Sequence, residues 1–185
     1  AEGAIPSFLV NTFAEDLVQD QISSSHPYGA FVVPYLAEAA GIYHTNPKLV
    51  FIPDDPRFGR HQPTFANTLA LYEERPAKDW SEADFFGNSP DIENTAKVLS
   101  NLAKDNDHYV DEPFVLRSRL FDMFIGDWDR HDDQWRWSEI DEGKGNRYRP
   151  IPRDRDQAFF VNDGFLPSIW KRRWALPKFE GFDED

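Results

Sequence analysis

Two short acidic segments constrain the architecture of this chain more than any other feature. The first, residues 126–134, reads Gly-Asp-Trp-Asp-Arg-His-Asp-Asp-Gln and ends an apolar run with helical spacing. The second, residues 152–159, reads Pro-Arg-Asp-Arg-Asp-Gln-Ala-Phe and lies beyond a predicted hairpin. Carboxylates in two turns, with an amide side chain between them, are the groups that phosphoryl transfer requires. The sequence therefore predicts that the two segments meet in one site.

The first segment supplies a candidate general base. A hydroxyl that attacks a nucleoside triphosphate must be oriented and must lose its proton, which one carboxylate at hydrogen-bond distance can accept. Asp129 is predicted to have this role. Arg130 and His131 adjoin it and are candidates for steadying the base or contacting phosphate. Their positive charge would favour the ionised form of Asp129.

The amide and the second segment supply candidate cation ligands. Magnesium, or manganese in its place, prefers oxygen ligands and takes few of them from the protein. The side-chain oxygen of Gln134 and the carboxylate of Asp154 would suffice, and Asp156 is a candidate second carboxylate ligand. We therefore expect a divalent cation as cofactor.

The order of these residues resembles the catalytic and metal-binding loops of atypical kinases. Asp-Arg-His, an amide five residues after the Asp, and then Asp-x-Asp-x-x-Phe are similar to phosphatidylinositol kinases, HipA toxin kinases, spore-coat CotH kinases and secretory-pathway kinases. Residues 152–159 resemble the CotH version most closely. Gln134 departs from these families, which usually carry Asn there. The resemblance implies an ATP-dependent phosphotransferase, with a nucleotide and an unidentified phosphoacceptor as partners.

The same resemblance implies an α+β, mainly helical fold that corresponds to the large lobe of a protein-kinase-like domain. Residues 1–185 would form one such domain, as a fragment of a longer protein. A Gly-rich loop and a strand lysine, which kinases use to hold the triphosphate, do not precede the first predicted helix, so the small lobe is expected upstream. By positional analogy, Glu73 and Glu74 would lie at the hinge between the lobes, where backbone groups contact adenine.

A second resemblance covers nearly the whole chain. Residues 24–30, 40–47 and 126–137 are similar to a domain found in large cell-envelope proteins of Bacteroidetes. This resemblance implies a cell-envelope or periplasmic location and further domains in a longer chain. It identifies no substrate.

Composition narrows the classes of partner. The 185 residues carry a formal net charge of -13, with a pI near 4.7, which argues against nucleic acid or an anionic membrane as a general partner. The absence of cysteine excludes disulfides, thiolate metal sites and cysteine nucleophiles. No apolar run approaches the roughly 18 residues of a membrane helix, so direct membrane insertion of this segment is not expected.

Periodicity and turn signals predict the secondary structure. Helices are expected over residues 8–22, 27–40, 91–103 and 112–125. Pro34 should kink or split the second of these. Residues 49–52 are predicted to be a buried strand and 68–74 a second strand, with a loop over 53–63 between them. Residues 135–138 and 147–151 flank a Gly-rich turn and predict a hairpin.

Two other function classes fit the same residues. A kinase-like binding or scaffold module without turnover is favoured by Gln134 and by the missing phosphate-binding loop. A metal-dependent phosphohydrolase is possible because His131 and the surrounding aspartates could bind two metals that activate water. That class usually needs several histidines, which the two segments lack.

Overall fold

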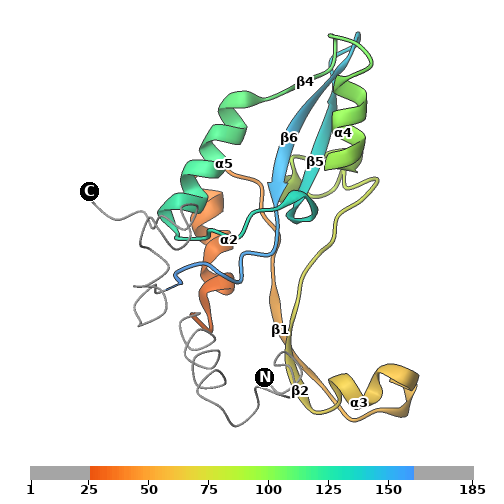
Figure 1. Ribbon diagram of the computed structural model, residues 1–185, viewed down its shortest axis with the longest axis vertical. Coiled ribbons are helices and arrows are strands. Elements are labelled where there is room, and N and C mark those ends of the chain that lie inside the picture. Colours follow the sequence, from red (N-terminus) through yellow and green to blue (C-terminus); the bar gives the residue numbers. More distant parts are fainter. Residues whose placement is uncertain (1–25, 161–185) are drawn as a thin grey trace, which may run out of the picture.

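A four-stranded sheet in the order β3-β5-β6-β4 organises this computed structural model, which describes residues 26–160 (Figure 1). A separate two-stranded sheet, β1-β2, projects from the opposite end of the molecule. The helical elements are α2 (Gly29–Ala39), η2 (Pro56–His61), α3 (Gln62–Phe65), η3 (Asp84–Phe86), α4 (Thr95–Leu102), α5 (Glu112–Phe124) and η4 (Asp132–Gln134). The strands are β1 (Lys48–Ile52), β2 (Thr68–Tyr72), β3 (Asp91–Asn94), β4 (Tyr109–Val110), β5 (Trp135–Asp141) and β6 (Asn146–Pro152).

The expectation of a mainly helical fold is wrong. Helices hold about 36% of the described residues and strands about 22%, so the described part is an α+β structure without helical dominance. One reason is that residues 91–94, which were expected to be helical, form β3 and pair antiparallel with β5. The helix begins only after Asn94, whose side chain caps it by accepting a hydrogen bond from the Lys97 N–H at 2.9 Å.

The predicted hairpin is confirmed, and its strands are longer than expected. β5 and β6 pair from Trp135 opposite Pro152 to Asp141 opposite Asn146. Pro150 and Pro152 are tolerated in β6 because β4, on its other side, pairs only near Arg147 and leaves the prolines at a free edge. The end of β6 at Pro152 therefore lies beside the start of β5 at Trp135.

The core beneath the sheet's lower end is made by α5 and α2. α5 starts at the Asp111 cap and is followed by Gly126 at φ 67°, the left-handed conformation that ends many helices. Phe121 and Ile125 pack with α2 in an apolar cluster. Its buried members are Val33, Ala37, Ile42, Phe121, Ile125 and Ala158. α2 runs unbroken through Pro34, so the expected split does not occur.

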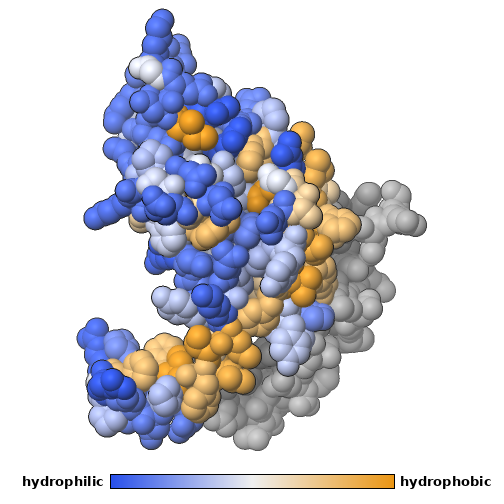
Figure 2. All heavy atoms as spheres, turned by 180° about the vertical axis from the view of Figure 1, so that it is seen from behind, coloured by the Kyte–Doolittle hydropathy of each residue, from blue (hydrophilic) through white to orange (hydrophobic). Residues whose placement is uncertain are grey.

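The β1-β2 hairpin forms where strands were expected, but β1 is not buried. Leu49, Phe51, Leu69 and Leu71 alternate onto one face and are 46–68% exposed, because no third strand or helix of the described part covers that face. Figure 2 shows hydrophobic residues gathered where this hairpin joins the body. The region expected to be a loop, residues 53–63, contains η2 and the start of α3.

Two further expectations concern helices. The helix predicted over residues 8–22 lies outside the described residues. Within residues 26–160, no helix has both the length and the apolar character needed to cross a membrane.

Candidate functional site

The β5-β6 hairpin brings the two acidic segments side by side. Gln134 ends the first segment just before β5, and Arg153 is the first residue of the second segment beyond β6. The Arg153 backbone N–H donates to the Gln134 carbonyl at 2.9 Å. Arg130 adds a second link, because its Nη1 donates to the Arg153 carbonyl at 2.6 Å and lies 3.3 Å from Gln134 Oε1.

Arg130 is an internal cross-link in this structure. Its side chain is 3% exposed, and its Nε donates to Asp122 Oδ2 at 3.1 Å. Its Nη2 forms an ion pair with Asp127 Oδ2. The guanidinium also lies 5.8 Å from the centre of the Trp135 ring. Together with the Arg153 carbonyl and Gln134 Oε1, five groups therefore contact the Arg130 side chain, and none of them is a solvent-facing anion.

Asp127 is a fully buried carboxyl beside the base candidate. Burial raises its pKa to about 7, although the positive charge of Arg130 opposes the rise; Asp122 adds to it by repulsion. Its Oδ1 has no hydrogen-bond partner among the described residues. This carboxyl titrates near neutral pH, unlike a surface aspartate.

Asp129 and Gln134 touch each other. Gln134 Nε2 donates to Asp129 Oδ2 at 3.2 Å, while Gln134 Oε1 faces Arg130. Both ends of the buried Gln134 amide thus have partners. Its oxygen faces the Arg130 guanidinium and its nitrogen faces the Asp129 carboxylate, the orientation that the charges of these two groups favour. His131 is exposed, and its carbonyl accepts the Gln134 N–H at 3.0 Å.

The second acidic segment turns sharply after β6. Asp154 is exposed and has a left-handed backbone, with φ 55°. Asp156 reaches solvent, yet loss of hydration raises its pKa, and the charges of Asp154 and Asp129 raise it further. Asp154 and Asp129, two other predicted site residues, therefore both lie close enough to Asp156 for their negative charges to act on it.

Glu73 and Glu74 tie the end of β2 to this turn. Glu73 Oε1 accepts the Asp154 N–H at 3.0 Å, and Glu74 Oε2 accepts the Asn46 N–H at 2.8 Å. The Glu74 carbonyl accepts a hydrogen bond from Arg153 Nε at 3.3 Å. Both glutamates hold the projecting hairpin against the site, and adenine binding by this stretch stays a prediction.

A pocket of about 110 Å³ lies between α2, the base of the β1-β2 hairpin and the second acidic turn. Its polar side includes His44, Glu73, Asp154 and Asp156, and Val33 and Leu71 are among its apolar residues. Pockets for drug-sized ligands begin at roughly 300 Å³, so this one suits a hydrated cation or a phosphoryl group. Burial lowers the pKa of His44, which favours its neutral form. His44 was not a predicted site residue, because no other histidine stands at metal-ligand spacing from it.

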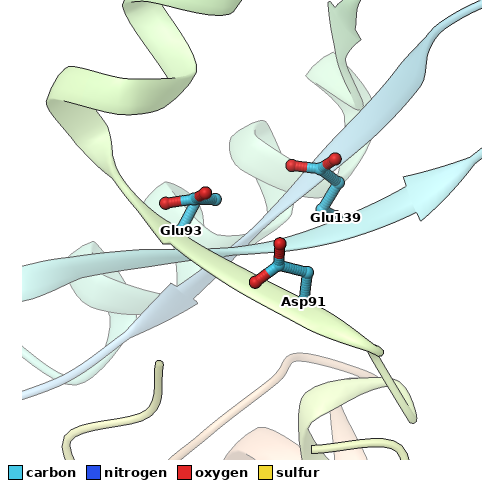
Figure 3. A group of neighbouring side chains, drawn as sticks. All are labelled: Asp91, Glu93 and Glu139. Carbon is cyan, nitrogen blue, oxygen red and sulfur yellow. The ribbon is translucent and has the colours of Figure 1, made fainter. Parts of the chain in front are cut away.

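A second acidic cluster lies elsewhere, on the four-stranded sheet (Figure 3). Oxygens of Asp91, Glu93 and Glu139 all lie within 4.8 Å of one another. Asp91 pairs with Glu139 across β3 and β5, and Glu93 is on the same face two residues later. Burial, followed by repulsion from the other two carboxylates, raises the pKa of Glu139. Sequence interpretation missed this cluster because a helix over 91–103 would not place Asp91 and Glu93 together.

Comparison of the chain with protein-family models, curated proteins and solved structures finds no match. The kinase resemblance therefore depends on residues 126–134 and 152–159 themselves.

Proposed function

We propose that the two acidic segments form a magnesium-dependent, ATP-using phosphotransferase site. Asp129 is the general base, and Asp154 and Asp156 bind the cation. The observation that carries the proposal is the direct connection of the two segments by the hairpin and by Arg130. Phosphoryl transfer depends mainly on positioning and on charge stabilisation, so a fixed relation between base and cation ligands is its central requirement.

The electrostatics of the second turn support a cation there. Asp156 is disfavoured as an anion by partial loss of hydration and by the charges of Asp154 and Asp129, and a divalent cation would offset that penalty. Magnesium usually takes one or two protein carboxylates and completes its shell with water and phosphate oxygens. A closed cage of carboxylates is therefore not needed. When bound, magnesium would neutralise charge on the transferred phosphoryl group.

Gln134 fits an orienting role better than the predicted ligand role. Its Nε2 holds Asp129, and its Oε1 would have to leave Arg130 before it could reach a cation. Asp129 would accept the proton of the attacking hydroxyl while this hydrogen bond fixes its second oxygen. His131, exposed at the edge of the loop, is available to contact the phosphate or the acceptor.

The pocket defines which part of the nucleotide would lie against Asp154 and Asp156. At about 110 Å³ it accommodates a cation or one phosphoryl group, and the nucleoside would lie outside it.

A binding module without turnover is the second candidate. It is favoured by one observation, namely that Arg130 and the oxygen of Gln134 are committed to each other and to internal partners.

The test separates the base from the cation ligands. Asp129→Asn should abolish measurable phosphotransfer while leaving magnesium-dependent ATP binding in place, because the base is not a ligand. Asp154→Asn combined with Asp156→Asn should remove the magnesium dependence of ATP binding. Asp133→Asn, an exposed carboxyl of the same loop that pairs with Arg75, is the matched control. ATP affinity is measured by calorimetry with and without magnesium, and transfer to water or protein with labelled ATP.

Unchanged transfer in Asp129→Asn would eliminate it as the base. Magnesium-dependent ATP binding in wild type without any transfer would favour the binding-module alternative.

A further inference from the structure

We infer that Asp122 is a positioning residue that holds both acidic segments in one cation-binding arrangement. The expected effect on cation binding rests on the proposed function, whereas the contacts that join Asp122 to both segments are observed in the structure. Asp122 lies in the last turn of α5, outside both segments. Its side chain is 1% exposed, so its charge must be balanced by protein groups.

One carboxylate reaches an arginine from each segment. Asp122 Oδ2 accepts from Arg130 Nε at 3.1 Å, and Asp122 Oδ1 accepts from Arg155 Nη2 at 3.0 Å. Arg130 follows Asp129 in the first segment, and Arg155 stands between Asp154 and Asp156 in the second. Arg119, from the preceding turn of the same helix, donates to Oδ2 at 2.9 Å. Asp122 therefore joins the helix to both segments.

The two segments depend on Asp122 to different extents. Arg130 has a second ion-pair partner in Asp127. Arg155, 5% exposed, has Asp122 as its ion-pair partner within the described part of the chain, and its Nε and Nη1 make no hydrogen bond there. Its guanidinium also lies 4.8 Å from the centre of the Phe121 ring. Loss of the Asp122 charge should therefore release the second segment more than the first.

That release would reach the proposed cation ligands directly. Asp154 and Asp156 flank Arg155 in the chain, so a shift of the Arg155 backbone moves both carboxylates. Groups that orient metal ligands without touching the metal typically change affinity by roughly 10- to 100-fold when they are removed. Asp122 would orient the proposed cation ligands in this way, through its contact with Arg155.

The experiment compares Asp122→Asn, which keeps the shape but not the charge, with Asp122→Glu, which keeps the charge. Asp133→Asn is the control, because Asp133 also contacts two arginines, Arg75 and Arg136, but is 66% exposed. Binding of manganese chloride is measured by electron paramagnetic resonance. Amide hydrogen exchange is followed over residues 127–134 and 153–158. Far-ultraviolet circular dichroism verifies folding.

We expect Asp122→Asn to weaken manganese binding at least about 10-fold and to speed exchange in 153–158 more than in 127–134. Asp122→Glu should recover part of both, and the control should match wild type. If Asp122→Asn does not fold, Arg155→Lys tests the same link, because one ammonium replaces the guanidinium fork.

Failure of the inference and failure of the proposed function give different results. Wild-type manganese binding that persists unchanged in a folded Asp122→Asn or Arg155→Lys variant overturns the positioning role and leaves the proposed site intact. Wild type that binds no manganese overturns the proposed site, and the exchange data then decide the connection alone. Equal exchange in wild type and Asp122→Asn would overturn that connection.

Discussion

Asp127 gives the protein a pH-dependent stability that can be isolated with one substitution. Its carboxyl is 1% exposed, and burial raises its pKa from 3.8 to about 7 despite the Arg130 ion pair. Between pH 3.8 and about 7, the folded protein holds a proton that the unfolded chain has already lost. The free energy of unfolding should therefore fall as the pH rises toward and through about 7. Asp127→Asn removes this titration while preserving the shape of the side chain.

The size of the effect follows from the two pKa values. Between about pH 5 and about pH 8, the contribution of Asp127 to the free energy of unfolding should decrease by about 3 kcal/mol. Urea denaturation of wild type and Asp127→Asn across this range gives the difference that isolates Asp127 from the other carboxyls. Asp133→Asn is the control, because Arg75 lowers the pKa of that exposed carboxyl and keeps it ionised throughout.

A wild-type minus Asp127→Asn difference that stays constant with pH would refute this reasoning. It would mean that the charge of Arg130 outweighs burial and keeps Asp127 ionised at pH 5.

Two further substitutions test packing, one at the site and one at the turn after η3. At about pH 8, where Asp127 is ionised, Arg130→Met should lower the free energy of unfolding by about 3–5 kcal/mol, because it leaves a buried charge without an ion pair. Arg75→Met, in an exposed pair, should cost at most about 1 kcal/mol. Equal losses in urea denaturation would contradict the buried role. Gly87→Ala should cost at least about 1–3 kcal/mol, because a Cβ at this φ of 76° would lie 2.0 Å from the Tyr43 hydroxyl. An unchanged melting temperature would show that the Tyr43 side chain can make room for the added Cβ without cost.

Local sequence signals predicted the elements that local interactions determine. Pro113 and Gly126 bracket α5, and the Gly-rich turn before Asn146 fixes the β5-β6 hairpin. β3 was missed because residues 91–94 become a strand only through pairing with β5. A short apolar run predicted β1, but it contains no information about whether another element covers the strand, so its burial was predicted wrongly.

The candidate site likewise combines local features, which the sequence predicts, with contacts between distant residues, which it does not. Asp129 and Gln134 share a loop, and the hairpin makes the approach of the second segment predictable from the sequence. Asp122 was not predicted, because a lone aspartate in a helix resembles a solvated surface residue. Only the folded chain brings Arg130 and Arg155 to it from segments on either side of the hairpin.

Manganese soaked into crystals and located by anomalous diffraction tests the central claim most directly, namely that the two acidic segments form one cation site. We expect a peak bound by Asp154 and Asp156, on the side facing Asp129. A peak on the sheet at Asp91, Glu93 and Glu139, with none at the acidic segments, would contradict the claim and assign cation binding to the other cluster.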